Sequence, residues 1–306
     1  MSKISELLAQ IKNLQIQTKD LVEGIESGTY NSKFRGGGIE FSEVREYIPG
    51  DDVKRIDWNV SARYNSLFVK EFVEEKELNV YVILDLSASN NFGFIKSKID
   101  LSFEVAVSLM FLALKNNDRL GLGIFTDKLE KFIPSKKGKK QVFRIIKELI
   151  EYKPQSKKTD ILKSLSTLEN KLKRKSVIYV ISDFLSDSYE KPLKILKLHH
   201  QVILLNISDI REKEMPKIGY AQIEDVETGE QILINTSDKN FQEQYTKTIS
   251  EKININQQSM KKIGIDMINL TNEESFEITI NRYFRSKWKM RNWWNLDLSM
   301  HYFFFY

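Results

Sequence analysis

One apolar run constrains the fold of this chain of 306 residues more than any other feature. Five β-prone residues, 80–84, lead directly into Asp85, and Ser87 and Ser89 follow. Such a run is typical of a buried strand in a parallel sheet. Open α/β sheets bind ligands at the carboxyl ends of their strands. Asp85, Ser87 and Ser89 alternate, so their side chains can converge, and their hard oxygen atoms suit Mg²⁺, Mn²⁺ or Ca²⁺.

From residue 79 onward, predicted strands alternate with predicted helices. This alternation favours an α/β fold with a doubly wound, mostly parallel, Rossmann-like sheet and right-handed crossovers. A hairpin is expected at the edge of the sheet, around Glu227-Thr228-Gly229-Glu230. The expected strands are 80–84, 120–125, 129–133, 176–182, 202–206 and 264–269, and the expected helices are 98–115, 139–152, 160–173, 190–199, 238–252 and 273–285.

The chain divides into four expected parts. Residues 1–28 form an amphipathic N-terminal helix, 29–77 a lead-in segment, 78–286 the α/β domain, and 287–306 an aromatic C-terminal tail. The lead-in is dense in paired opposite charges, which are compatible with a solvated loop but favour a hydrogen-bonded scaffold that docks on the sheet domain through Trp58 and Tyr47. A short strand is expected near 67–73. Its three glycines, 36–38, lack the Gly-Lys-Ser/Thr of a phosphate loop, so a flexible turn is expected there.

Composition excludes several classes of site. There are no cysteines and only three histidines, which argues against thiolate metal sites and against histidine-based catalysis. No stretch reaches the roughly 18 apolar residues of a membrane span. We therefore expect no transmembrane segment and no signal peptide, and the cytoplasm is the expected compartment.

Charge favours a mixed, solvated surface. The 47 basic and 42 acidic residues give a net charge of +5. Two lysine-rich runs, 136–140 and 171–175, carry no interleaved aromatic residues. They are interpreted as solvated ends of helices and loops, and nucleic acid is not an expected partner.

Two further positions can join the first three at the carboxyl edge of the sheet. Asp183 follows the buried strand 176–182, and Thr159 opens a predicted helix. Thr159 can serve as an N-cap or turn its hydroxyl into the same crevice. Taken singly, each residue is more simply a cap or a turn residue. Together, Asp85, Ser87, Ser89, Thr159 and Asp183 resemble the metal-ion-dependent adhesion site of von Willebrand factor type A (VWA) domains.

The sequence upstream of these residues indicates a more specific family. The segments EFSEVREYIPGDDVKRIDWNVSAR and KEFVEEKELNVYVILDLSAS closely resemble the domain of unknown function 58 family, which joins such a lead-in to a VWA domain. That resemblance implies a soluble partner protein, commonly encoded beside an AAA+ ATPase of the MoxR type with which we expect it to act, and it implies no enzymatic activity. It also implies that Ser87 and Ser89 ligate the metal directly, and Thr159 directly or through water. Asp85 and Asp183 would act through water or by hydrogen-bonding the hydroxyls.

Two functions follow from these residues. The leading hypothesis is a metal-dependent protein-interaction module, with Mg²⁺ as the expected ion and a partner protein supplying a carboxylate to it. The alternative is a Mg²⁺-dependent hydrolase or phosphatase that uses Asp85 and Asp183. No positioned base or nucleophile is evident in the sequence near these residues, which favours the first hypothesis.

Overall fold

A computed structural model describes residues 38–75, 77–87, 97–186, 189–209, 212, 217–224, 231–272, 275–284 and 286. The described chain falls into two compact units with a boundary between Leu78 and Asn79. The expected N-terminal helix, the aromatic tail and Ser89 lie outside the described residues.

The smaller unit is built on a two-stranded antiparallel ribbon, where the sequence predicted a short strand only near 67–73. The first strand was missed, and the expectation of a flexible turn is wrong at Gly38, where this strand begins. The pairing register shifts between Phe41 and Glu43, so a bulge interrupts the apolar alternation that would have indicated a strand. Its elements are β1 (Gly38–Glu46), η1 (Val53–Arg55), α3 (Trp58–Tyr64) and β2 (Phe68–Glu75).

Charged side chains hold the turn between these strands. The guanidinium of Arg45 donates to both carboxylate oxygens of Asp51, at 2.7 and 2.8 Å, and Asp51 also accepts from the backbone N–H of Ile48. Asp57 caps α3 by accepting from the N–H groups of Asn59 and Val60. The charged lead-in is thus a hydrogen-bonded scaffold within its own unit.

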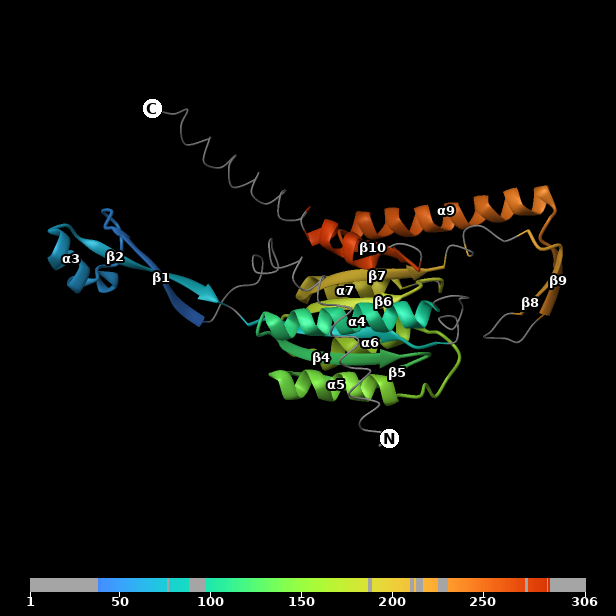
Figure 1. Ribbon diagram of the computed structural model, residues 1–306, viewed down its shortest axis with the longest axis horizontal. Helices are drawn as coiled ribbons and strands as arrows, with labels where there is room; N and C mark the ends of the chain where they lie inside the picture. The colour runs from blue at the N-terminus through green and yellow to red at the C-terminus, as the bar shows by residue number, and fades with distance from the viewer. Residues whose placement is uncertain are drawn as a thin grey trace, which may run out of the picture. The chain divides into compact units, whose positions relative to one another are not determined.

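The larger unit contains a six-stranded sheet in the order β10-β7-β6-β3-β4-β5 (Figure 1). All neighbouring pairs run parallel except β4 and β5, which are antiparallel. A separate hairpin joins β8 (Tyr220–Glu224) to β9 (Gln231–Asn235). The six strands are β3 (Asn79–Asp85), β4 (Arg119–Phe125), β5 (Leu129–Lys137), β6 (Val177–Ser182), β7 (Gln201–Ser208) and β10 (Asp266–Thr271).

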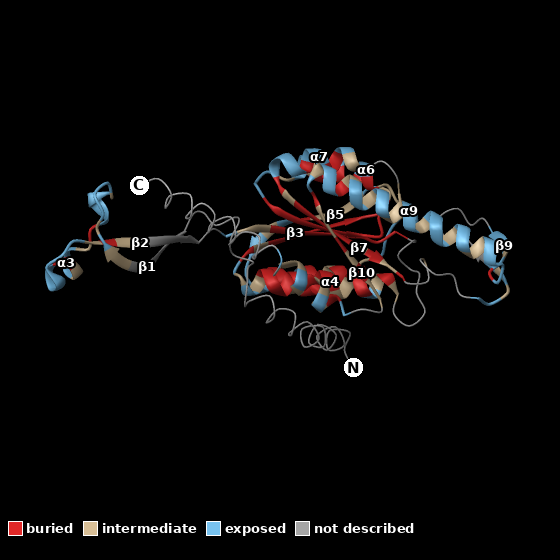
Figure 2. Ribbon diagram, turned by 90° about the horizontal axis from the view of Figure 1, so that it is seen from above, coloured by how far each residue is buried: buried red, intermediate tan, exposed pale blue. Residues whose placement is uncertain are grey.

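Helices cover both faces of this sheet, with α4 on one face and α6, α7 and α9 on the other (Figure 2). The alternation of side chains along each strand divides the core: Tyr81 and Ile83 pack with α6 and α7 in one apolar cluster. The mixed α/β fold with a mostly parallel sheet is therefore confirmed. The helices are α4 (Lys98–Lys115), α5 (Lys139–Glu151), α6 (Ile161–Lys171), α7 (Glu190–His199) and α9 (Lys239–Ile263), and residues 276–284 are also helical.

The expected helix at 238–252 is too short, because α9 continues to Ile263. The added residues, 253–263, are mostly polar and carry no continuous apolar stripe. The true stop is Gly264, which adopts the left-handed conformation (φ 66°) of a helix C-cap. Within the described part of the chain, no helix has both the length and the apolar character needed to cross a membrane.

Candidate metal centre

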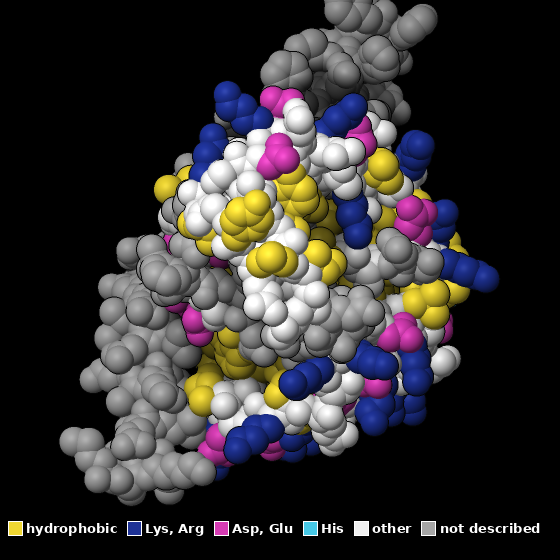
Figure 3. Space-filling model, turned by 90° about the vertical axis from the view of Figure 1, so that its right-hand side faces the viewer, with side chains coloured by type: hydrophobic (Ala, Val, Ile, Leu, Met, Phe, Trp, Pro, Cys, Tyr) yellow, Lys and Arg dark blue, Asp and Glu magenta, His cyan; other side chains and the backbone are white. Residues whose placement is uncertain are grey.

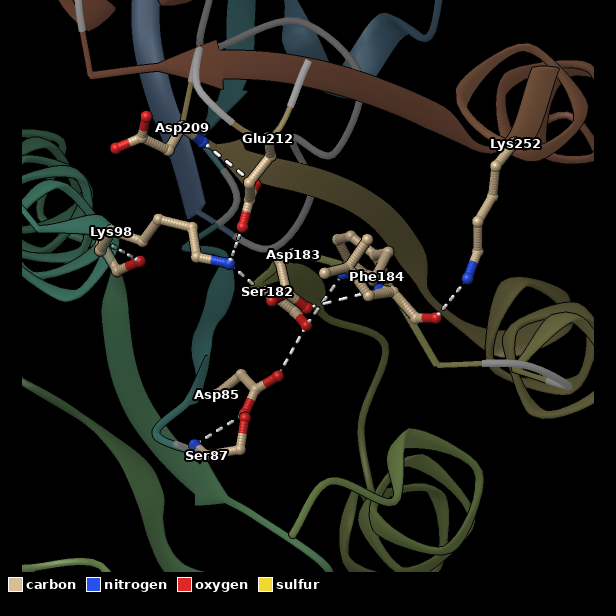
Figure 4. A network of polar contacts seen from close by, with 11 residues as sticks. Asp85, Ser87, Lys98, Ser182, Asp183, Phe184, Asp209, Glu212 and Lys252 are labelled. Atoms are coloured by element: carbon tan, nitrogen blue, oxygen red, sulfur yellow. Dashed lines mark hydrogen bonds and ion pairs between the residues drawn. The ribbon is translucent and has the colours of Figure 1, made fainter. Parts of the chain in front are cut away.

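Asp85 belongs to a buried polar network at the carboxyl edge of the sheet (Figure 4). It ends β3 and is 1% exposed. Its Oδ1 accepts from the backbone N–H of Ser87 at 2.9 Å, and its Oδ2 accepts from the hydroxyl of Ser182 at 2.6 Å. Burial, and next the charge of Asp183, raise the pKa of Asp85 to about 6. The ionised form of a buried carboxylate near a second carboxylate is strongly stabilised by a nearby positive charge.

Two other residues proposed as hydroxyl ligands, Ser87 and Thr159, lie at this edge, but only Ser87 has a described contact with Asp85. Ser87 is fully buried beside Asp85, and its side chain also hydrogen-bonds that carboxylate. Thr159 lies in the loop before α6, and its neighbour Asp160 donates its N–H to the carbonyl of Thr126, just beyond β4. Asp160 caps α6, so the interpretation of Thr159 as the N-cap is wrong. This loop therefore reaches the same edge of the sheet.

Asp183 forms a buried ion pair that the sequence did not reveal. The ammonium group of Lys98 lies 2.9 Å from Oδ2 of Asp183, and their side chains are 1% and 3% exposed. The same ammonium lies 2.6 Å from Oε1 of Glu212. Asp183 thus already has a cationic partner within the protein, and the carboxylate of Asp85 accepts from the backbone of Ser87 and from the hydroxyl of Ser182.

Lys98 occupies a position that disfavours a positive charge in two ways. It is the first residue of α4, at the positive end of the helix dipole, and it is buried. Burial lowers the pKa of Lys98, but the charges of Asp183 and Glu212 outweigh that effect and raise it. The capping box between Ser97 and Asp100 fixes the first turn of α4 and so the starting point of the lysine side chain.

The network extends along the edge to the end of β7. Glu212 accepts through Oε2 from the backbone N–H of Asp209 at 3.2 Å. Asp209 is itself 1% exposed and accepts from the side-chain amide of Asn272, which follows β10. Lys98 therefore links the ends of several adjacent strands through charged groups.

The backbone is strained next to this network. Phe184 has a positive φ of 49°, an uncommon conformation for a residue with a bulky side chain. Its N–H donates to the hydroxyl of Ser182, the same hydroxyl that donates to Asp85, and its ring is fully buried. The backbone therefore turns sharply after Asp183, and Oδ1 of Asp183 accepts from the N–H of Leu185.

The described residues fit a cation only in part. Among them, no three acidic, histidine or cysteine side chains are placed to hold a metal ion, so a ligand set would need hydroxyl groups. Asp85 and Ser87 provide one carboxylate and one hydroxyl side by side, which suits a hard cation. The ammonium of Lys98 contacts the carboxylates of Asp183 and Glu212, and the charge of Asp183 acts in turn on Asp85, so these three carboxylates outnumber the one lysine.

Sequence reasoning overlooked Lys98, Glu212 and the role of Ser182. A lysine in the first turn of a helix that is apolar almost all round was a usable signal for Lys98. Ser182 is the last residue of the fully buried strand β6, directly before Asp183. Because side chains alternate along a strand, the sequence placed Ser182 on the opposite side from Asp183 and did not indicate that it contacts Asp85. The sequence around Glu212 has no periodic pattern, and nothing in it pointed to this residue.

Comparison with known proteins identifies the family. The model of the family described as "Protein of unknown function DUF58" matches residues 43–254. The uncharacterized proteins Rv1480 of Mycobacterium tuberculosis and Mb1516 of Mycobacterium bovis are each 28% identical over 228 residues, which is 73% of this chain and 72% of theirs. The conserved hypothetical protein BatB from Bacteroides thetaiotaomicron has a similar solved structure, with a TM-score of 0.42 and 16% identity over 69% of this chain and 99% of BatB. The family match spans all five candidate residues and most of the chain, which therefore belongs to the DUF58 family of proteins of unknown function.

Proposed function

We propose that this protein is a divalent-cation-dependent protein-interaction module. The observation that carries the proposal is the buried carboxylate of Asp85, which is surrounded by hydroxyl groups and lies close to the charge of Asp183. Asp85 and Ser87 would hold the ion, with Ser89 and Thr159 as further ligands. A bound Mg²⁺ would supply an open coordination position for a carboxylate of the partner. The ion pair of Asp183 and Lys98 would stabilise the carboxyl edge of the sheet next to the ion.

The finer assignment within this proposal is a VWA domain with an adhesion-type metal site. It is supported by the order of Asp85, Ser87, Ser89, Thr159 and Asp183 along the chain and by the resemblance of the lead-in. The same resemblance supports a MoxR-type AAA+ ATPase as the partner and the cytoplasm as the compartment. In this proposal the pair acts in the assembly or maturation of another complex.

Exposed apolar side chains in the larger unit support a protein as the partner. Leu185, two residues beyond Asp183, is 45% exposed. The hairpin β8–β9 exposes Tyr220, Ile232 and Leu233 by 61–76%. Figure 3 views the end of the molecule on which this hairpin lies, and hydrophobic side chains are exposed there among Lys and Arg side chains. Apolar surface of this kind is typical of protein-binding regions.

The pairing of Asp183 with Lys98 disfavours the hydrolase alternative. Two-carboxylate metal catalysis needs both Asp85 and Asp183 to face the ion. Here the ammonium of Lys98 already neutralises Asp183. We therefore propose a binding role without turnover. A phosphate-ester assay on the purified protein tests this point, because turnover that is lost in Asp85→Asn would restore the alternative.

The partner is tested with purified MoxR-type ATPase at a constant Mg²⁺ concentration. Chelation is unsuitable, since the ATPase itself needs Mg²⁺ for nucleotide. Instead, capture by the wild-type protein is compared with capture by Asp85→Asn and Ser87→Ala. Glu243→Gln, an exposed change on α9, is the matched control for loss of a carboxylate.

The proposal predicts capture by the wild type and the control, and a loss of about tenfold or more in the two site variants, as when one strong polar contact is removed. Circular dichroism spectra establish that each variant is folded. Equal capture by all four folded proteins would contradict the proposal.

A further inference from the structure

A basic pocket lies at the opposite edge of the larger sheet, at the amino ends of β3, β4 and β6. It has a volume of about 560 Å³ and is lined by Asn79 and Arg119, the first residues of β3 and β4, and by Ser176 just before β6. The end of α6 and the loop after it form another wall, with Lys171, Lys173 and Arg174. The volume is within the range of pockets that hold small molecules.

The lining carries four positive charges and no acidic side chain among the described residues. Bringing Arg119, Lys171, Lys173 and Arg174 together costs repulsion, and the concave shape concentrates their field. Lys171 is explained by its place in the last turn of α6, where a cation is favourable. That explanation does not extend to Arg119, which begins a strand.

Arg119 gives an independent indication of a ligand. Its Nε is buried and has no hydrogen-bond partner within the described part of the chain. A buried donor without an acceptor is costly, and a guanidinium presents its donors in a fork that matches an oxyanion such as phosphate. A phosphate oxygen in the pocket would satisfy this donor.

The floor of the pocket is rigid. The rings of Tyr81 and Phe132 stack at 5.6 Å with an interplanar angle of 11°. The hydroxyl of Tyr81 accepts from the backbone N–H of Ser135 at 3.1 Å, and the hydroxyl of Ser135 donates to Oδ1 of Asn79 at 3.0 Å. These bonds join β3 to β5, so the pocket is formed before any ligand binds.

From these observations we infer that this pocket binds a small molecule carrying two or more phosphate groups. Arg119 contacts one phosphate at the base of the pocket, while Lys173 and Arg174 contact another nearer the opening. An extended nucleic-acid strand fits less well, because it is bound along a continuous basic groove with stacking aromatic rings. The rings of Tyr81 and Phe132 stack on each other instead. This site is separate from the proposed metal centre and does not depend on it.

The test uses inorganic tripolyphosphate as the probe, with the full chain in buffer free of divalent cations, and measures binding by calorimetry. Lys173→Glu/Arg174→Glu changes two exposed residues of the pocket rim. Lys247→Glu/Lys261→Glu makes the same change in net charge on exposed positions of α9. Arg119→Lys keeps the charge at the base of the pocket but removes the fork.

We expect saturable binding by the wild type, a loss of about tenfold or more in Lys173→Glu/Arg174→Glu and in Arg119→Lys, and little change in the α9 control. No saturable binding would overturn the inference, as would equal losses in the two charge-matched variants. Unchanged affinity in Arg119→Lys would also overturn it. A single-stranded oligonucleotide that binds the same residues more tightly than tripolyphosphate would assign the pocket to nucleic acid instead.

Discussion

The ammonium group of Lys98 lies 2.9 Å from Oδ2 of Asp183, and both side chains are almost completely buried. This ion pair joins the first turn of α4 to the end of β6 at the edge that holds Asp85. It places a permanent cation beside one of two neighbouring carboxylates. The other carboxylate, Asp85, is consequently the one that we propose for an exchangeable metal ion.

Breaking the buried ion pair should destabilise the protein. Lys98→Met leaves Asp183 buried without its cation, and we expect the free energy of unfolding to fall by about 3–5 kcal/mol. Adding Asp183→Asn to this variant should recover part of the loss, because the uncompensated charge is then removed. Urea denaturation at pH 7 measures both effects.

Lys131→Met is the control for this prediction. The side chains of Lys131 and its partner Glu148 are 33% and 35% exposed. The free energy of unfolding should therefore fall by only about 0–1 kcal/mol. Strictly additive losses from Lys98→Met and Asp183→Asn would show that the two side chains do not interact in solution.

Asp85 should make the metal-free protein less stable as the pH rises from about 4 to about 6. Its pKa is raised from 3.8 to about 6, so in this window the folded protein binds the proton more tightly than the unfolded chain does. Folding therefore loses up to about 3 kcal/mol of free energy as this proton is released. Asp85→Asn cannot ionise and should lack this part of the decline.

The measurement is urea unfolding in EDTA at a series of pH values. The difference between the wild type and Asp85→Asn isolates the residue from other titrating groups. A difference that stays constant between pH 4 and pH 6 would contradict a raised pKa at Asp85.

The smaller unit should lose stability in acid through Asp51. The hydrogen bonds from Arg45 and then from the N–H of Ile48 lower the pKa of Asp51 from 3.8 to about 2. Its stabilising contribution is complete above pH 3.8 and is lost as the pH falls toward 2. The amide resonance of Ile48, followed by NMR, should titrate with the pKa of Asp51.

Asp52→Asn is the neighbouring control, since Asp52 accepts from the N–H of Lys54 and takes no part in the Arg45 contact. Asp51→Asn should abolish the low-pH transition at Ile48, while Asp52→Asn should retain it. A transition near pH 4 in the wild type would be inconsistent with the bidentate contact.

Gly121→Ala should be more destabilising than Gly123→Ala, although both glycines lie on β4. A Cβ at position 121 would lie 2.3 Å from the ring of Tyr81 and 2.9 Å from the carbonyl oxygen of Ile133. At position 123 it would meet the flexible Cδ1 of Ile83 at 2.7 Å. Overpacking of this kind costs about 1–3 kcal/mol, so we expect Gly121→Ala at the upper end.

Thermal unfolding compares the two glycine variants. Because Tyr81 forms part of the floor of the basic pocket, Gly121→Ala should also weaken tripolyphosphate binding. An equal fall in melting temperature for both variants would mean that a Cβ beside the ring of Tyr81 costs no more than a Cβ beside Ile83.

Much of the sheet unit could be predicted from sequence because its elements carry strong local signals. The helices 98–115 and 190–199 have the predicted bounds, and the strand ending at Asp85 was expected from its apolar run. The bulged strand β1 and the polar end of α9 lack such signals. Pairing with β2 defines β1, and the single glycine Gly264 defines the end of α9. Lys98 and Glu212 could not be placed with Asp183, because their contact depends on how α4 and Glu212 are positioned against the sheet in three dimensions.

Calorimetric titration of the metal-free protein with Mg²⁺ tests the proposed metal centre most directly. We expect saturable binding of one ion per chain by the wild type and by Glu243→Gln, and a loss of about tenfold or more in Asp85→Asn and Ser87→Ala. If Mg²⁺ fails to bind, or binds equally well to the folded Asp85→Asn variant, the carboxyl edge of this sheet is not a metal centre.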